Sequence, residues 1–187
     1  MKIAVIDIDG VLNYYPQTFL DFIFSQTLNK YETLDDAKNR ISYTYYKQLK
    51  QMYRNSDFKN DAKPREYAKD FLLYLRKHGY LIYIITSREL YKNNMLEKTI
   101  CWFNKNELIY DFIYESKKKD FTIFEKFGKI DILVEDSTDN INKIMKICDI
   151  ERCYNIMNNE NKSFKVNCRR VWSLREIWKD LELERSK

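Results

Sequence analysis

Side chains suited to metal and phosphate chemistry stand at the ends of three short apolar segments of this 187-residue chain. In chain order they are Asp7 and Asp9, then Thr86, Ser87 and Arg88, then Glu135 and Asp136. Short, almost wholly apolar segments are typical of strands that are buried on both faces of a parallel sheet. Because ligands of such sheets bind beyond the carboxyl ends of the strands, we expect these side chains to meet at one edge.

Carboxylates that converge on one point repel each other unless a cation lies between them, and Mg²⁺ suits such oxygen ligands. A bound Mg²⁺ also holds a phosphate group well, because it neutralises charge and keeps open coordination positions. One aspartate can then attack phosphorus, and a second, two residues later, can exchange a proton with the leaving oxygen. A hydroxyl group and a lysine can bind the phosphate oxygens that gain charge during transfer.

The rest of the chain predicts the elements that position these groups. Strands are expected at residues 2–8, 80–86, 111–114, 130–134 and 153–157, and helices that include residues 100–103, 140–147 and 174–183. This alternation predicts an α/β fold, with a Rossmann-like parallel sheet that is covered by helices on both faces.

Residues 14–64 differ from the rest, being aromatic, charged and helical in period. Thr33 before two aspartates predicts a helix start. Pro64 predicts the start of a further helix that ends at His78 and Gly79. We therefore divide the chain into an α/β core, residues 1–13 and 65–187, and a small inserted helical cap, residues 14–64.

The sequence Asp7-Ile8-Asp9-Gly10-Val11-Leu12 resembles the first motif of the haloacid dehalogenase (HAD) superfamily of aspartate-nucleophile phosphatases. Thr86-Ser87-Arg88 is similar to the second motif, and Glu135-Asp136 to the acidic pair of the fourth. The inserted segment lies where these enzymes carry a helical cap. Among subfamilies, the chain is similar to the 5′(3′)-deoxyribonucleotidase-like group and to related phage phosphatases.

The resemblance implies a role for each of these residues. Asp7 is the implied nucleophile and Mg²⁺ ligand. Asp9 is the implied general acid and base, with its backbone carbonyl on the metal, and Asp136 or Glu135 completes the metal shell. Thr86 or Ser87 is expected to bind phosphate, and Arg88 to help hold the substrate.

The third family motif is a single lysine, and here three stand in a row. We favour Lys119 over Lys118 for its spacing to the acidic pair, with Lys117 the third candidate. The same motifs also have simpler interpretations, since Asp-x-Asp-Gly builds turns and both Thr86-Ser87 and Ser137 can begin helices.

Composition excludes several classes of protein. The chain is 44% hydrophobic and 16% aromatic, which is enough for a core and argues against general disorder. No apolar segment is long enough to predict a membrane span. The four cysteines are scattered, so we expect reduced thiols in a cytoplasmic protein rather than a zinc site. A net charge of +5 permits a nucleic-acid or nucleotide partner without requiring one.

We therefore expect a Mg²⁺-dependent phosphomonoesterase that forms an aspartyl-phosphate on Asp7. A nucleoside monophosphate is the favoured small-molecule substrate, because a cap of this size should close over the site. One or two cap aromatics could stack on the base. The alternatives are a phosphatase of nucleic-acid 3′ or 5′ ends, a dehalogenase that needs no metal, and a non-catalytic binding module of the same fold.

Overall fold

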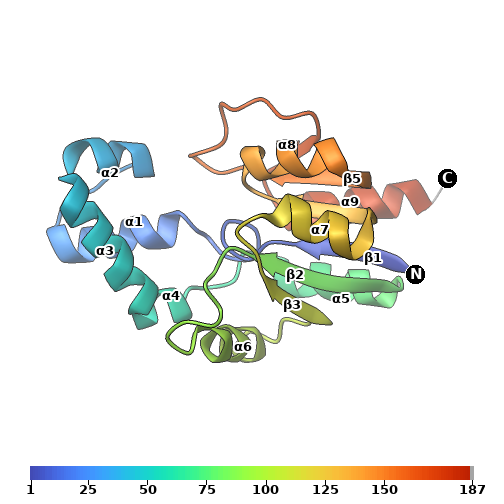
Figure 1. Ribbon diagram of the computed structural model, residues 1–187, viewed down its shortest axis with the longest axis horizontal. Coiled ribbons are helices and arrows are strands. Elements are labelled where there is room, and N and C mark those ends of the chain that lie inside the picture. Colours follow the sequence, from blue (N-terminus) through green and yellow to red (C-terminus); the bar gives the residue numbers. More distant parts are fainter. Residues whose placement is uncertain (186–187) are drawn as a thin grey trace.

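In the computed structural model, which describes residues 1–185, six parallel strands form one sheet in the order β3-β2-β1-β4-β5-β6 (Figure 1). The strands are β1 (Lys2–Ile6), β2 (Tyr80–Thr86), β3 (Phe112–Glu115), β4 (Lys129–Glu135), β5 (Asp149–Ile156) and β6 (Arg169–Val171). The chain therefore has the α/β, Rossmann-like fold that the alternation of apolar segments predicts.

Helices cover both faces of this sheet. They are α5 (Ala68–Lys77), α6 (Met95–Lys105), α7 (Lys119–Phe127), α8 (Thr138–Ile147) and α9 (Leu174–Arg185). Side chains of β1 alternate between the two faces, with Ala4 and Ile6 in the core cluster of α5, α6 and α9 and Val5 in that of α7 and α8. Burial on both faces explains why β1 is apolar at every one of these positions.

Four more helices form a separate lobe beside the sheet, at the left of Figure 1. They are α1 (Gln17–Thr27), α2 (Leu34–Arg40), α3 (Tyr43–Asn55) and α4 (Asp57–Asn60), and all lie within residues 14–64. The lobe has its own core, in which the ring of Phe19 packs against those of Tyr46 and Tyr53. Thr33 caps α2 as predicted, accepting a hydrogen bond from the backbone N–H of Asp36 at 3.0 Å.

The predicted helix start at Pro64 is wrong. The chain is still returning from the lobe at this point, where Pro64 forms an isolated antiparallel bridge with Asn13. The backbone N–H of Arg65 donates to the carbonyl of Leu12 at 2.7 Å, and α5 begins only at Ala68. A tertiary contact with the segment after β1 thus outweighs the local preference of proline for a helix start.

Two further differences concern the sheet's far side. The fifth strand is longer than predicted, because its first half, from Asp149, pairs with β4 although it is partly charged. Strand β6 (Arg169–Val171) was not predicted, since three residues with two arginines carry no strand pattern. This strand forms because it pairs with β5, and the local sequence does not indicate that contact.

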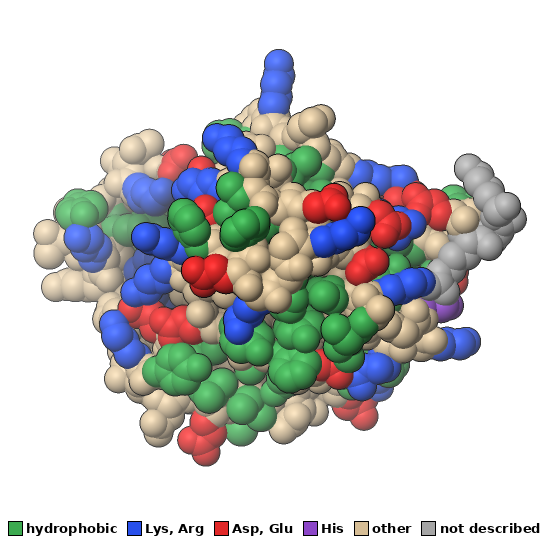
Figure 2. Space-filling model, turned by 45° about the vertical axis from the view of Figure 1, so that its right-hand side comes forward, with side chains coloured by type: hydrophobic (Ala, Val, Ile, Leu, Met, Phe, Trp, Pro, Cys, Tyr) green, Lys and Arg blue, Asp and Glu red, His purple; other side chains and the backbone are tan. Residues whose placement is uncertain are grey.

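The opposite edge of the sheet, at β3, is incompletely covered. Phe112 of β3 and Phe121 and Phe124 of α7 are each 42–54% exposed. The Tyr83 ring of β2 stacks on that of Phe112, with centroids 4.8 Å apart. On the face drawn in Figure 2, apolar side chains gather in the lower half and charged side chains surround them.

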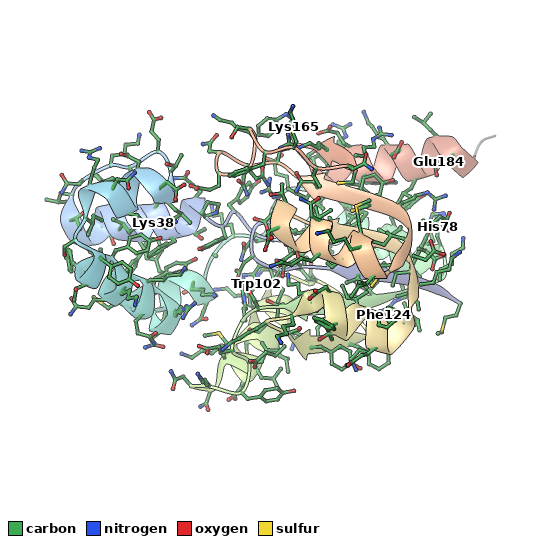
Figure 3. All side chains as sticks on the ribbon, turned by 45° about the horizontal axis from the view of Figure 1, so that its top comes forward. Lys38, His78, Trp102, Phe124, Lys165 and Glu184 are labelled. Carbon is green, nitrogen blue, oxygen red and sulfur yellow. The ribbon has the colours of Figure 1, made fainter. Side chains whose placement is uncertain are left out.

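The end of the sheet away from the lobe carries His78, which closes α5 (Figure 3). The four cysteines are free thiols. Across residues 1–185, no helix has both the length and the apolar character needed to cross a bilayer.

Candidate active site

The carboxyl ends of β1, β2 and β4 lie side by side at the edge of the sheet that faces the lobe (Figure 1). Ile6, the last residue of β1, pairs with Ile84 of β2 and Val134 of β4. Asp7 extends this alignment by one residue, since its N–H donates to the carbonyl of Val134 at 3.1 Å. The three segments that carry the candidate residues therefore end together.

Asp7, Glu135 and Asp136 form a cluster in which one oxygen from each carboxyl group lies within 4.8 Å of the others. Asp7 is 6% exposed and Glu135 2%. Burial raises the pKa of Asp7 to about 7, although Lys119 opposes the shift. Burial and the charges of Glu135 and Asp7 also raise the pKa of Asp136. This cluster therefore needs positive charge to be fully ionised at neutral pH.

Lys119, the first residue of α7, supplies part of that charge. Its Nζ lies 2.9 Å from Asp7 Oδ1 and 2.6 Å from Glu135 Oε2. Burial would lower the pKa of Lys119, but the two carboxylates outweigh it and hold this pKa above its ordinary range. Lys119 in turn helps to keep the pKa of Glu135 below its usual value, against the effect of burial. One ammonium group thus joins the ends of β1 and β4.

The other two lysines of the row point elsewhere. Lys118 is exposed and lies over the ring of Phe121, 5.8 Å from its centroid. Lys117 pairs with Glu89 at 3.0 Å on the surface. The structure brings Lys119 into the carboxylate cluster and leaves Lys118 outside it.

Three asparagines donate hydrogen bonds to Asp136, and Gly10 leaves room for its carboxylate. Its carbonyl oxygen accepts hydrogen bonds from Asn155 at 2.9 Å and Asn161 at 2.7 Å, and its Oδ2 accepts one from Asn158 at 3.2 Å. Gly10 has φ +90°, and a Cβ atom there would lie closer than 3.0 Å to Asp136 Oδ2. Glycine thus permits both this backbone conformation and the close approach.

Asp9, two residues after Asp7, lies in a different electrostatic environment. Its carboxylate accepts two hydrogen bonds from Arg88, at 2.6 and 2.9 Å, and one from Asn13 at 2.9 Å. Lys59 Nζ, from α4 of the lobe, lies 3.4 Å away. Burial would raise the pKa of Asp9, but Arg88 and then Lys59 outweigh it and hold this pKa far below its ordinary range.

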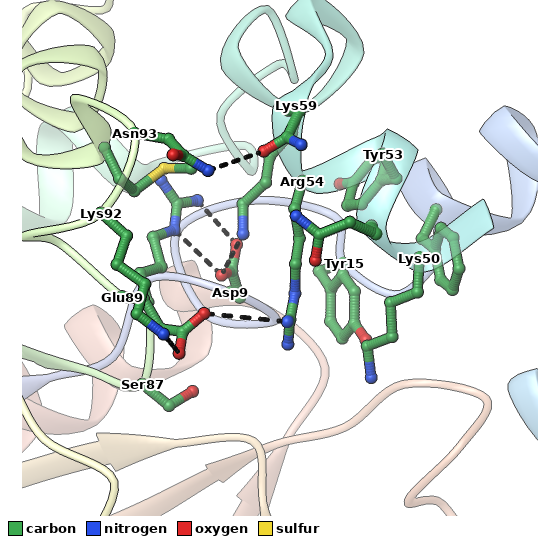
Figure 4. A pocket seen from close by; sticks show the side chains of 15 residues that line it. Asp9, Tyr15, Lys50, Tyr53, Arg54, Lys59, Ser87, Glu89, Lys92 and Asn93 are labelled. Atoms are coloured by element: carbon green, nitrogen blue, oxygen red, sulfur yellow. Dashed lines mark hydrogen bonds and ion pairs between the residues drawn. The ribbon is translucent and has the colours of Figure 1, made fainter. Parts of the chain in front are cut away.

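The two hydroxyl residues at the end of β2 have different positions. Thr86 is the last residue of the strand and is buried, and its Oγ1 accepts a hydrogen bond from the N–H of Arg88 at 3.2 Å. Ser87 is exposed and lines a cavity together with Asp9 and Arg88 (Figure 4). Ser87 is therefore the hydroxyl that is open to a ligand, although Thr86 holds the strand-end position.

The donor set at Asp7, Glu135 and Asp136 fits a hard divalent cation. All three groups offer carboxylate oxygens, which Mg²⁺ prefers. Asp7 Oδ1 is buried and, among residues 1–185, accepts no hydrogen bond of ordinary geometry, although the Lys119 ammonium is near. The Asp9 carboxylate is absent from this cluster, because Arg88, Lys59 and Asn13 occupy it.

Sequence reasoning did not find Lys59, Asn13 or the three asparagines at and after the end of β5. Lys59 reaches Asp9 from a helix 50 residues away, and no local pattern indicates such a contact. The asparagines did leave a signal, since Asn155 lies near the end of β5 and Asn158 and Asn161 follow it at intervals of three. Polar residues at a strand end, in a sheet of this type, are candidates for the same edge.

The sequence matches no protein-family model and no curated protein. The structure, however, is similar to solved structures along nearly its whole length. One is a protein described as a "predicted phosphatase" from Clostridium acetobutylicum, with a TM-score of 0.65 and 15% identity over 97% of this chain and 98% of that one.

A HAD hydrolase of family IA from Entamoeba histolytica has a TM-score of 0.59 and 17% identity, covering 94% of this chain and 95% of that one. A dehalogenase also has a TM-score of 0.59, with 13% identity and 96% of each chain covered. At these identities the likeness concerns the fold alone, and it shows that the chain shares its architecture with these solved structures.

Proposed function

We propose that this protein is a Mg²⁺-dependent phosphomonoesterase in which Asp7 is the nucleophile. The observation that carries the proposal is the placement of Asp7 at the strand ends, where Lys119 contacts both Asp7 and Glu135 and where Asp136 completes the carboxylate cluster. HAD-type hydrolases of the same fold, phosphatases among them, support it. Asp7, Glu135 and Asp136 would hold Mg²⁺, which when bound supplies charge neutralisation for carboxylate and phosphate alike.

In the proposed reaction, a carboxylate oxygen of Asp7 attacks phosphorus and the ester oxygen departs, which leaves an aspartyl-phosphate. In this reaction Lys119 and Ser87 would donate hydrogen bonds to the phosphate oxygens as these gain charge, since Lys119 contacts Asp7 and Ser87 is open to the cavity beside Asp9. Water then attacks the aspartyl-phosphate, which releases inorganic phosphate and restores Asp7.

Asp9 is the proposed acid and base, and its surroundings define what each role requires. As the ionised partner of Arg88 and Lys59 it is in the form that receives a proton from the attacking water, but its very low pKa makes it a weak base in this arrangement. To protonate the leaving oxygen it must first carry a proton, which its very low pKa in this arrangement disfavours. We therefore infer that the contact between Arg88 and Asp9 loosens when substrate binds.

For the substrate, we propose a nucleoside monophosphate. The cavity beside Asp9 measures about 290 Å³, which is close to the lower end of small-molecule sites and favours a monomer over a nucleic-acid end. Among the lobe's aromatic residues, Tyr15 lines this cavity and is only half-buried, so its ring is available to a base. Phe19 and Tyr53 also line it, but both are buried in the lobe's core.

The test is a panel of phosphate esters assayed with Mg²⁺ and with EDTA, using the wild type and Asp7→Asn. We expect Mg²⁺-dependent phosphate release by the wild type, loss of turnover in Asp7→Asn, and an unchanged circular-dichroism spectrum. Asp70→Asn, an exposed change on α5, is the matched control. Turnover by Asp7→Asn would refute the mechanism, halide release without metal would indicate a dehalogenase, and binding without turnover would indicate a binding module.

A further inference from the structure

The cavity beside Asp9 lies between the lobe and the sheet and is walled by both (Figure 4). Residues of α3 and α4 line one side, and Ser87, Arg88 and the loop that follows β2 line the other. Asn93 of that loop donates a hydrogen bond to Asn55 at the end of α3, at 3.4 Å, which joins the two walls. A ligand in this cavity would extend from the strand ends toward α3.

The cavity walls carry more positive than negative charge. The basic residues that line it are Lys50, Arg54, Lys59, Arg88 and Lys92, and the acidic ones are Asp9 and Glu89. Two of these cations are already paired with Asp9, since Arg88 and Lys59 both contact its carboxylate. Glu89 accepts hydrogen bonds from Lys92 at 2.8 Å and from Lys117 at 3.0 Å.

Lys50 and Arg54 remain as a pair of cations one helical turn apart on α3. Within residues 1–185, no carboxylate forms an ion pair with Lys50, and Arg54 only reaches Glu89 at 4.0 Å. Figure 4 shows both side chains extending from α3 into the cavity. Burial, and then the charge of Arg54, lowers the pKa of Lys50, as expected for a cation that lacks a counter-charge.

Among residues 1–185, Lys50 has no carboxylate partner, and Arg54 has only Glu89, at 4.0 Å. An anionic ligand would therefore meet uncompensated positive charge on this wall of the cavity. We propose that this cavity takes a phosphomonoester whose leaving group carries a second phosphate, and that Lys50 and Arg54 bind that second phosphate. This inference rests on the proposed function, because the first phosphate must lie at Asp7 for the second to reach α3. It deepens that function from a monophosphate to a bisphosphate substrate class.

The test compares a nucleoside 5′-monophosphate with the corresponding 3′,5′-bisphosphate in the presence of Mg²⁺. Values of kcat/KM are measured for both compounds, with products identified by chromatography, in the wild type, Lys50→Gln/Arg54→Gln and Lys47→Gln. Lys47 is the matched control, since it is exposed on the same helix and lies over Tyr43, outside the cavity. Dissociation constants of both compounds are measured by calorimetry on Asp7→Asn, with and without the two α3 changes.

We expect the wild type to prefer the bisphosphate by about tenfold or more, as charge-assisted hydrogen bonds to a phosphate would give. The preference should fall to within about twofold in the double variant and persist in Lys47→Gln. A wild-type preference below twofold, or one that the double variant retains, would overturn the inference while leaving the phosphatase proposal in place. Absence of all hydrolysis would overturn the phosphatase proposal. The ratio of the two dissociation constants, judged by the same limits with and without the two α3 changes, would still decide whether Lys50 and Arg54 bind a second phosphate.

Discussion

Gly10 offers the sharpest test of the carboxylate cluster, because a single methyl group there would displace Asp136. Its φ of +90° is one that L side chains rarely adopt, and the added Cβ would overlap the Asp136 carboxylate. The protein contains a natural control in Gly79, which has φ +78° and no atom within 4 Å of an added Cβ. Gly10→Ala and Gly79→Ala therefore share the backbone strain and differ in the overlap.

The magnitudes separate the two effects. Backbone strain should lower the free energy of unfolding by about 1–2 kcal/mol in both variants. For a domain of this size, each 1 kcal/mol corresponds to a melting temperature lower by roughly 2–4 °C. The overlap should add little to this without metal, because Asp136 can turn away and thereby reduces its repulsion with Glu135 and Asp7. A displacement of the carboxylate on the order of 1 Å should nevertheless lower activity by roughly a hundredfold.

The assay measures the melting temperature in EDTA, its rise on adding Mg²⁺, and kcat/KM on the best ester of the panel. We expect Gly79→Ala to lose stability only, and Gly10→Ala to lose most of the Mg²⁺-induced rise and of the activity as well. If Gly10→Ala bound Mg²⁺ and turned over substrate as well as Gly79→Ala does, Asp136 would not be a ligand and the reasoning would be refuted.

Three more predictions follow from the charges of the site. In EDTA, the raised pKa of Asp7, about 7 against 3.8 when unfolded, means that the folded protein binds the extra proton, so stability should fall as pH rises from about 4 to 7. The fall in the free energy of unfolding is at most about 4 kcal/mol. Denaturant titrations at pH 5 and 8 should show this fall in EDTA and a much smaller one in Mg²⁺. Greater stability at pH 8 than at pH 5 in EDTA would contradict the prediction. Lys119→Met should lower the free energy of unfolding by about 3–5 kcal/mol, because it leaves two buried carboxylates unpaired. Lys118→Met, at an exposed position, should leave this free energy unchanged, and equal losses of stability in the two variants would contradict the placement of Lys119 in the cluster. Arg88→Lys keeps the charge but not the two-point hydrogen bonding to Asp9, so the pKa of Asp9 should rise. The limb of the pH–rate profile that Asp9 controls should then move upward, the acid limb if Asp9 acts as a base and the alkaline limb if it acts as an acid, and a profile with both limbs unmoved would count against either role.

Much of the fold was predictable because buried parallel strands carry a local signal. The segments at 80–86 and 130–134 are apolar at nearly every position, and their polar ends mark the edge where ligands bind. The order of strands is not encoded so locally, and β6, with two arginines in three residues, is recognisable only by its pairing with β5. Pro64 shows the same limit, since a contact with Asn13 decides its conformation.

The candidate site was predictable where its residues stand at the ends of parallel strands, which meet at one edge of the sheet. It was not predictable where the lobe contributes a residue. The spacing to the acidic pair favoured Lys119 among the three lysines, and in the structure Lys119 is buried in the cluster while Lys118 lies outside it. The family resemblance implied that Arg88 helps to hold the substrate, whereas in the structure Arg88 is the main partner of Asp9. Lys59 could not be predicted, because its approach to Asp9 depends on how the whole lobe packs.

The two aspartates of the first motif have pKa values displaced in opposite directions, and the proposed mechanism requires both displacements to be reversed. Asp7 is held partly protonated by burial and by Glu135, so it becomes an effective nucleophile only when a cation lies beside it. Asp9 is held ionised by Arg88 and Lys59, so it can donate a proton only when those contacts loosen. Since Arg88 and Lys59 both line the cavity that faces α3, an anionic ligand there competes with Asp9 for them. Binding of a cation would thus favour the ionised Asp7 that attacks phosphorus. Binding of an anionic substrate would raise the pKa of Asp9, so that Asp9 can carry the proton that the leaving oxygen needs.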